Sequence, residues 1–215
     1  MKKRTLVSLG ISCQTAHQLA RFTNEHSDPA SFQKGPFDWL ICPVLSAAEW
    51  LDNGLIDFTQ NEITIARNHA YWPKFGFWFW HGFYTKSDTE RKLKIYQNTP
   101  REQEKLAYQR AQFQNLDPQN TIFIISNTQN NLLGEVFKEG EESLFHFTND
   151  HINKLQSSLD RYFGTPINLK IITREHRADK ALLDQANTYI LSAETSDWKG
   201  ENKDWDQALR SLCKN

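Results

Sequence analysis

The sequence predicts an α/β fold: a largely parallel sheet with helices on both faces, in a single domain over residues 1–215. Short apolar runs alternate along the chain with amphipathic stretches of about 10–17 residues, a pattern typical of βαβ units. One run, Thr121–Ser126, is nearly continuous in apolar residues, as expected of a strand covered on both faces. Nine glycines and seven prolines in 215 residues fall well below the average share of roughly 12%, which argues against a turn-dense all-β fold.

The first strand and helix begin this pattern. Thr5–Leu9 is apolar and rich in β-formers, and Gly10 follows directly, so we expect a buried strand that ends in a tight turn. A helix then begins at Ile11 or Ser12 and runs to about Phe22. The further elements predicted are a polar loop at 25–35, a helix at 44–52 between Pro43 and Gly54, a strand at 63–66, a helix from Thr99 to about Asn115 with Pro100 in its first turn, strands at 121–126, 169–173 and 188–191, an irregular stretch at 130–147, and helices at 149–162 and 204–213.

Aromatic residues make up 13% of the chain and include seven tryptophans. They are dense at about 56–98, which we interpret as an insertion folded over the strand ends. One interpretation is a core built from large rings. The other is a groove for a flat ligand such as a sugar, with Trp72, Trp78 and Trp80 as stacking platforms.

Charge and cysteine content exclude several classes of protein. The net charge is −1, with 25 Lys and Arg against 26 Asp and Glu, which gives no electrostatic reason to expect nucleic acid or membrane as a partner. Three cysteines show no metal-ligand spacing, and no phosphate-binding glycine loop is present, so we expect no cofactor. Reduced thiols favour a cytoplasmic location, and we interpret the apolar run after Met1–Arg4 as the first strand rather than an export signal.

Cys13 is the candidate nucleophile. It follows the first predicted strand at the start of a helix, where unpaired N–H groups and the helix dipole stabilise a thiolate. In open α/β sheets, ligands bind at the carboxyl ends of the strands. The alternative is that Cys13 is a small buried apolar residue, the usual state of a cysteine that forms no disulfide.

A nucleophilic cysteine needs a base within hydrogen-bonding reach. His81 follows the aromatic block, where neighbouring rings exclude water. His17 lies one helical turn after Cys13 and is the local competitor. Asp38 lies between two aromatic residues, so as a buried carboxylate it needs a partner; it either orients a histidine or caps a turn locally.

Three stretches of sequence resemble one known family. Ser8-Leu9-Gly10-Ile11-Ser12-Cys13, then Pro36-Phe37-Asp38-Trp39, then Trp80-His81-Gly82-Phe83 are similar to motifs of a family of uncharacterised bacterial proteins described as papain-like cysteine peptidases. The resemblance implies Cys13 as nucleophile, His81 as base and Asp38 as supporting carboxylate. Gly82 departs from the family pattern, which has an acidic residue there, so the histidine would have to recruit another group.

These observations lead to a thiol hydrolase or acyltransferase acting on a peptide, acyl or glycan-type substrate. The predicted substrate-binding residues adjoin the catalytic candidates: Ser8, Gly10, Ser12, Trp39, Trp78 and Trp80. Two alternatives stay open, a glycan or nucleotide-sugar binding module and an esterase-like enzyme in which cysteine replaces serine after the first strand.

Overall fold

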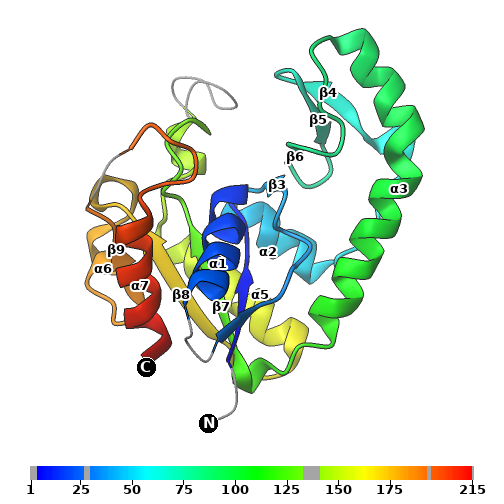
Figure 1. Cartoon of the computed structure of the whole chain (residues 1–215). Helices are drawn as coiled ribbons and strands as arrows, with labels where there is room; N and C mark the ends of the chain where they lie inside the picture. The colour runs from blue at the N-terminus through cyan, green and yellow to red at the C-terminus, as the bar shows by residue number, and fades with distance from the viewer. Residues whose placement is uncertain (1–3, 27–29, 133–140, 193–194, 215) are drawn as a thin grey trace.

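A five-stranded parallel sheet forms the centre of the computed structural model, which describes residues 4–26, 30–132, 141–192 and 195–214 (Figure 1). The strand order is β2-β1-β7-β8-β9, and every pairing is parallel. The α/β fold class is therefore confirmed. The strands are β1 (Arg4–Ser8), β2 (Ala30–Phe32), β7 (Thr121–Ser126), β8 (Asn168–Thr173) and β9 (Thr188–Ile190).

The winding of the sheet reverses at β1. From β1 the chain passes to β2 on one side, and later enters β7 on the other side of β1. Leu6 accordingly lies in register with Phe32 of β2 and with Ile122 of β7. In doubly wound sheets of this order, the ligand crevice opens outside the carboxyl ends of the two strands that flank the reversal, here β1 and β7.

Helices cover both faces of the sheet (Figure 1). Leu6, Ile122 and Ile124 contribute to a core on the side of α1 (Cys13–Glu25) and α7 (Asn202–Lys214). The alternate residues Val7 and Phe123 belong to the larger core. This second core includes buried residues of α2 (Val44–Asp52) and α5 (Asn149–Phe163). The alternation follows from the two-residue period of a strand, and it explains why the strand sequences are apolar throughout.

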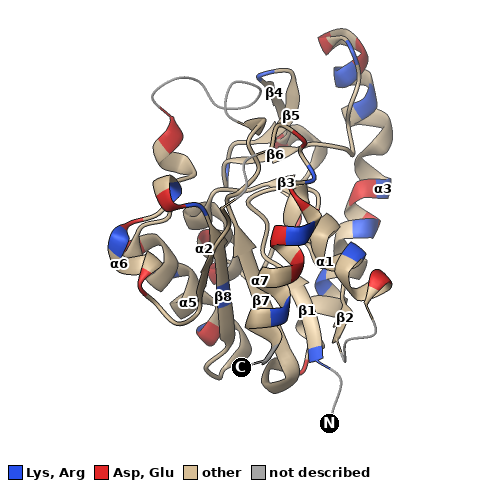
Figure 2. Ribbon diagram, turned by 60° about the vertical axis from the view of Figure 1, so that its left-hand side comes forward, with Lys and Arg blue, Asp and Glu red and all other residues tan. Residues whose placement is uncertain are grey.

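A second, antiparallel sheet lies beyond the carboxyl ends of the parallel strands (Figure 1). Its order is β3-β6-β5-β4, and the long helix α3 (Asp88–Gln114) runs beside it. Both signs of charge occur along α3 (Figure 2). The strands are β3 (Leu40–Ile41), β6 (Phe77–Phe79), β5 (His69–Trp72) and β4 (Thr64–Ala66).

Most of the large rings near this second sheet build the core. Trp72 is fully buried and makes edge-on contacts with Trp50, Phe58 and Phe77. Trp78 is buried as well, while Trp80 is partly exposed and stacks on His69. Of the three tryptophans considered as stacking platforms, only Trp80 therefore presents part of its ring to solvent.

The structure differs from the sequence-based expectations mainly in α3. This helix begins at Asp88 instead of Thr99, because the Ser87 hydroxyl caps it by accepting a hydrogen bond from the Glu90 N–H. Pro100 lies inside the helix rather than in its first turn. Its ring faces solvent, and the Thr99 hydroxyl donates to the Ile95 carbonyl in the preceding turn.

Several short elements were not anticipated. Strand β2 lies within the expected polar loop, β3 directly follows the Pro36–Trp39 stretch, and α6 (Lys180–Leu183) lies between β8 and β9. Part of the stretch expected to be irregular, 133–140, falls outside the described residues. The described residues also contain the 3₁₀ turns η1 (Gln60–Glu62), η2 (Pro118–Asn120), η3 (Glu142–Leu144) and η4 (Glu175–Arg177). In the described parts of the chain, no helix combines the length and apolar character needed to cross a membrane.

Candidate active site

The turn between β1 and α1 is conformationally strained. Gly10 has a φ of +80° and Ile11 a φ of +28°, and a positive φ is a true outlier for a β-branched residue. The Cys42 N–H donates to the Ile11 carbonyl at 3.0 Å, which helps to hold this conformation. A Cβ atom on Gly10 would also lie 3.4 Å from the Phe37 carbonyl oxygen. Strain of this kind persists only where the surroundings enforce it, and it is concentrated at functional sites.

Cys13 is the first residue of α1, directly after this turn. Only 4% of the residue is exposed. Burial raises the pKa of the Cys13 thiol to about 11, and a hydrogen bond from its own backbone N–H opposes this only in part. The thiolate expected from the helix terminus is therefore not the resting state, because desolvation outweighs the dipole. Cys13 is a protonated thiol at neutral pH.

The segment from Leu40 to Cys42 joins this turn to the antiparallel sheet. Leu40 and Ile41 pair with Phe79 and Trp78 of β6 on one side, and Cys42 pairs with Ile11. Three consecutive residues therefore pair with β6 and with the turn before Cys13.

His81 follows β6 by two residues and therefore leaves the antiparallel sheet beside this segment. Its ring meets Trp39 edge-on, with the centroids 5.3 Å apart. Partial burial lowers the pKa of His81, and the charge of Lys105 lowers it further. The imidazole is therefore neutral at neutral pH, the form that accepts a proton. Neither His81 nor His17 is among the groups that shift the pKa of Cys13.

Asp38 is 1% exposed and lies one residue before Trp39. Its Oδ2 accepts a hydrogen bond from the Gly35 N–H at 2.9 Å, while Oδ1 has no hydrogen-bond partner among the described residues. Burial raises the pKa of Asp38 to about 8, although the Gly35 bond and the charges of Lys34 and Lys105 oppose the shift. The observed bond is the local turn cap considered from the sequence, and one oxygen is left without a partner.

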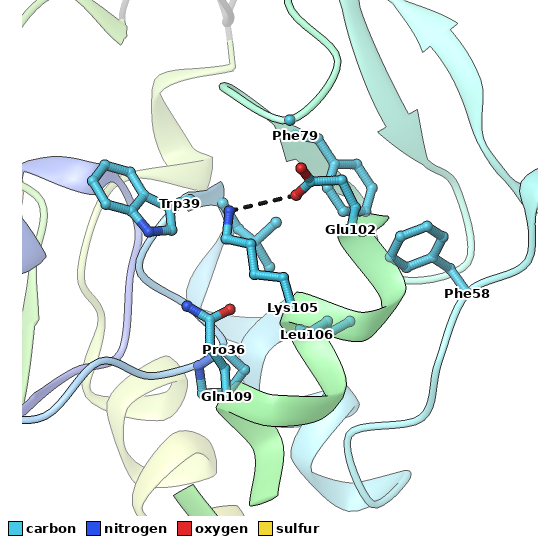
Figure 3. Close-up of a pocket in the computed structure, with 10 residues that line it drawn as sticks. Pro36, Trp39, Phe58, Phe79, Glu102, Lys105, Leu106 and Gln109 are labelled. Carbon is cyan, nitrogen blue, oxygen red and sulfur yellow. Dashed lines mark hydrogen bonds and ion pairs between the residues drawn. The ribbon is translucent and has the colours of Figure 1, made fainter. Parts of the chain in front are cut away.

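A small cavity of about 30 Å³ lies beside Trp39 and Gly82 (Figure 3). Glu102 and Lys105 of α3 form an ion pair in its wall, with 3.4 Å between Nζ and Oε2. A Cβ atom on Gly82 would lie 2.8 Å from the Glu102 carboxylate. Glu102 thus occupies the space next to the backbone of residue 82, and no sequence pattern indicated it, because α3 brings it there from 20 positions away.

Buried polar side chains line the carboxyl ends of β1 and β7. The Thr128 hydroxyl donates to Gln14 Oε1 at 2.6 Å and lies 2.9 Å from the Ser126 hydroxyl. The amide of Gln14 donates to the Trp198 carbonyl at 2.6 Å. These contacts attach the first turn of α1 to the loop after β7 and to the loop before α7. In the sequence, the polar residues that directly follow the apolar strand at 121–126 are the feature that could have indicated these contacts.

The other predicted residues occupy defined places. The buried Ser8 hydroxyl accepts from the Gly10 N–H, and Ser12 is the buried N-cap residue of α1, with no side-chain bond to the helix. His17 contacts Trp198, with 5.0 Å between centroids, and burial lowers its pKa. Of the residues predicted to bind substrate, Trp39 and Trp80 are partly exposed.

No family model, curated protein or solved structure matches this chain. Within residues 4–26, 30–132, 141–192 and 195–214, no group of three or more His, Cys, Asp or Glu side chains is arranged to hold a metal ion.

Proposed function

We propose that the protein is a thiol-dependent acyl-transfer enzyme, a hydrolase or an acyltransferase, with Cys13 as the nucleophile and His81 as the general base. One observation carries the proposal: the short Leu40–Cys42 segment pairs both with β6, which precedes His81, and with the strained turn before Cys13. Residues from the two sheets thereby meet at the carboxyl edge where doubly wound folds bind ligands.

The protonation state of the Cys13 thiol determines how the nucleophile is activated. Because the Cys13 sulfur is protonated, the proton must pass to an imidazole as sulfur attacks the acyl carbon, which is base-assisted catalysis rather than attack by a preformed thiolate. A C–S bond forms, the bond to the leaving group breaks, and His81 returns the proton to the leaving group. Water, or an acceptor alcohol, amine or thiol, then cleaves the thioester.

The first turn of α1 supplies the oxyanion donors. The Ser12 side chain makes no capping hydrogen bond to the described backbone, so N–H groups of this turn stay available to the negative oxygen of the tetrahedral intermediate. Helix N-termini favour such an anion. These N–H groups do not lower the pKa of the Cys13 thiol enough to ionise it at neutral pH. Their contribution is therefore to stabilise the transition state and not to activate the resting thiol.

The parallel sheet favours the esterase-like form of this function. A nucleophile after the first parallel strand, close to the reversal in strand order, is the arrangement considered above for an esterase-like enzyme, so small esters and thioesters are the first substrates to test. The resemblance to papain-like cysteine peptidases adds peptide amides as the second substrate class to be tested. Burial of Trp72 and Trp78 removes two of the three rings on which a glycan-binding module would depend.

Acyl-enzyme trapping tests the proposal. The protein is mixed with p-nitrophenyl acetate, quenched in acid and mapped by peptide mass spectrometry. We expect one acetyl group on Cys13, a burst of p-nitrophenolate, and loss of both in Cys13→Ala and His81→Gln. Cys213→Ala is the control, because Cys213 lies on α7 outside the site. Acetylation that persists in Cys13→Ala, or an unchanged rate in His81→Gln, would contradict the assignment.

A further inference from the structure

A cavity of about 520 Å³ lies at the antiparallel sheet and contains none of the residues assigned to acyl transfer. One wall is the turn between β4 and β5, and the other is the loop that leads into α3 together with the first turn of that helix. The volume falls in the range of small-molecule sites in proteins, roughly 300–1,000 Å³. The side chains that line the cavity include Asn68, His69, Tyr84, Lys86, Asp88 and Arg91.

Backbone conformation and hydrogen bonds hold both walls in place. Strands β4 and β5 are joined by a two-residue turn in which Arg67 and Asn68 have φ angles of +50° and +62°, as a type I′ turn requires. In the other wall, the Thr85 hydroxyl donates to the Ser87 carbonyl at 2.7 Å. The Arg91 guanidinium donates to the Thr85 carbonyl at 2.8 Å. The cavity is therefore formed by fixed backbone segments.

His69 is a buried imidazole whose ring nitrogens have no hydrogen-bond partner among the described residues. Only 9% of the residue is exposed, and its ring stacks on Trp80 with 4.4 Å between the centroids. Burial lowers the pKa of His69, and the positive charge of Arg91 lowers it further, so the ring is neutral at neutral pH. A neutral imidazole has one N–H donor and one acceptor nitrogen, and this combination matches a hydroxyl group.

Arg91 gives the second wall its positive charge. The residue is 3% exposed, and of the five N–H donors of a guanidinium one bonds to the Thr85 carbonyl and one to the Asp88 carboxylate. Its Nε has no partner among the described residues. Residues 86–94 contain four Lys or Arg and two Asp or Glu, and the N-terminus of α3, a helix of 27 residues, adds the positive end of its dipole.

We propose that this cavity binds a monosaccharide that carries one acidic group, a uronate or a sugar phosphate. Arg91 and the exposed Lys86 bind the acidic group, because a guanidinium donates in a planar fork that matches carboxylate and phosphate oxygens, and an ammonium adds a point charge. On the β4–β5 wall, Arg67 is already paired with Glu141, so the acidic group lies toward α3.

The remaining lining groups suit the neutral part of a sugar. His69 and the Asn68 amide each offer a donor and an acceptor to hydroxyl groups. The Asp88 carboxylate would repel a simple anion, but it accepts hydrogen bonds from sugar hydroxyls. Tyr84 is 58% exposed, so its ring is available to cover the apolar face of the sugar. A charged ligand without hydroxyl groups would leave these groups unused.

Glucuronate and glucose 6-phosphate are the probes. The Cε1–H signal of His69 is followed by NMR as each probe is added to the full-length protein. We expect a saturable shift with at least one acidic sugar, and the tighter probe identifies the acidic group. Glucose, which lacks the charge, and inorganic phosphate, which lacks the sugar, are expected to bind at least about tenfold more weakly. Cys13→Ala is expected to bind like the wild type, because binding needs no reactive thiol.

Two pairs of variants at exposed positions locate the site. Lys86→Gln is expected to weaken binding of the tighter acidic sugar about tenfold. Lys92→Gln is its matched control, because it removes the same charge from an exposed residue outside the cavity lining. Tyr84→Ala is also expected to weaken binding, and Tyr96→Ala is its control, since Tyr96 is 66% exposed and does not line the cavity.

Three results would each overturn the proposal. The first is that neither acidic sugar shifts the His69 signal of the wild-type protein. The second is that glucose or inorganic phosphate binds as tightly as the acidic sugars. The third is that Lys86→Gln weakens binding no more than Lys92→Gln.

Discussion

Alkylation of Cys13 gives the sharpest test of how this site is activated. A thiol with a pKa of about 11 has roughly one part in 10⁴ as thiolate at pH 7, against about 3% for an ordinary thiol of pKa near 8.5. Ionisation alone therefore makes the unliganded Cys13 about 300-fold less reactive toward iodoacetamide than an exposed cysteine. Burial of the sulfur slows the reaction further.

The assay is peptide mapping after timed exposure to iodoacetamide between pH 7 and 10. We expect Cys213, which is partly exposed, to react first, and the fully buried Cys42 to stay unmodified. The rate at Cys13 should rise about tenfold per pH unit across this range. His81→Gln should leave the alkylation rate unchanged while abolishing acyl transfer, because the base acts only during attack.

Modification of Cys13 at pH 7 as fast as that of Cys213 would refute this reasoning. The thiolate would then already be formed, and a preformed ion pair would replace the base-assisted mechanism.

Three further substitutions test other parts of the site. The carboxyl of Asp38 has a pKa of about 8 when folded and about 3.8 otherwise, so folding retains a proton between these values. The free energy of unfolding should therefore fall by about 1 kcal/mol for each pH unit of rise. Urea unfolding midpoints measured at pH 5 and pH 8 should show this dependence in the wild type and in the control Asp184→Asn, and a weaker dependence in Asp38→Asn. Gly10→Ala should lower the free energy of unfolding by about 1–2 kcal/mol and abolish acyl transfer. Gly54→Ala is the control and should keep activity, because Gly54 has a similar φ of +71° and no atom within 4 Å of its Cβ position. Equal activities of the two variants would show that the turn at Gly10 does not position Cys13. Thr128→Val should lower the free energy of unfolding in urea by about 1–3 kcal/mol, because it leaves the buried Gln14 Oε1 without its hydrogen-bond donor. An unchanged urea midpoint would contradict the role of this contact.

Elements with local signals were predictable from the sequence. Helix α2 has the predicted bounds of Val44–Asp52, with Pro43 before it and Gly54 after it. Helix α5 covers Asn149–Phe163, against the predicted 149–162, and its C-cap residue Gly164 has a left-handed φ of 67°. The buried strands β1, β7 and β8 were predicted within one residue at each end.

Elements stabilised by distant partners were not predictable. Strands β2 and β3 contain three and two residues, too few to show a periodic pattern, and they depend on pairing with β1 and β6. The candidates Cys13, Asp38 and His81 came from motif residues, but the burial of Cys13 depends on packing that no local pattern reports. Glu102 was missed for the same reason, because only tertiary structure places it beside Gly82.

The hydrogen bond from the Cys42 N–H to the Ile11 carbonyl links the antiparallel sheet to the turn that precedes Cys13. Because Cys42 directly follows β3, any displacement of β6 that moves β3 also reaches the Ile11 peptide, whose φ of +28° is already unfavourable. Cys13 lies two residues after Ile11, so the first turn of α1 is the part of the parallel-sheet layer most directly affected by such a movement.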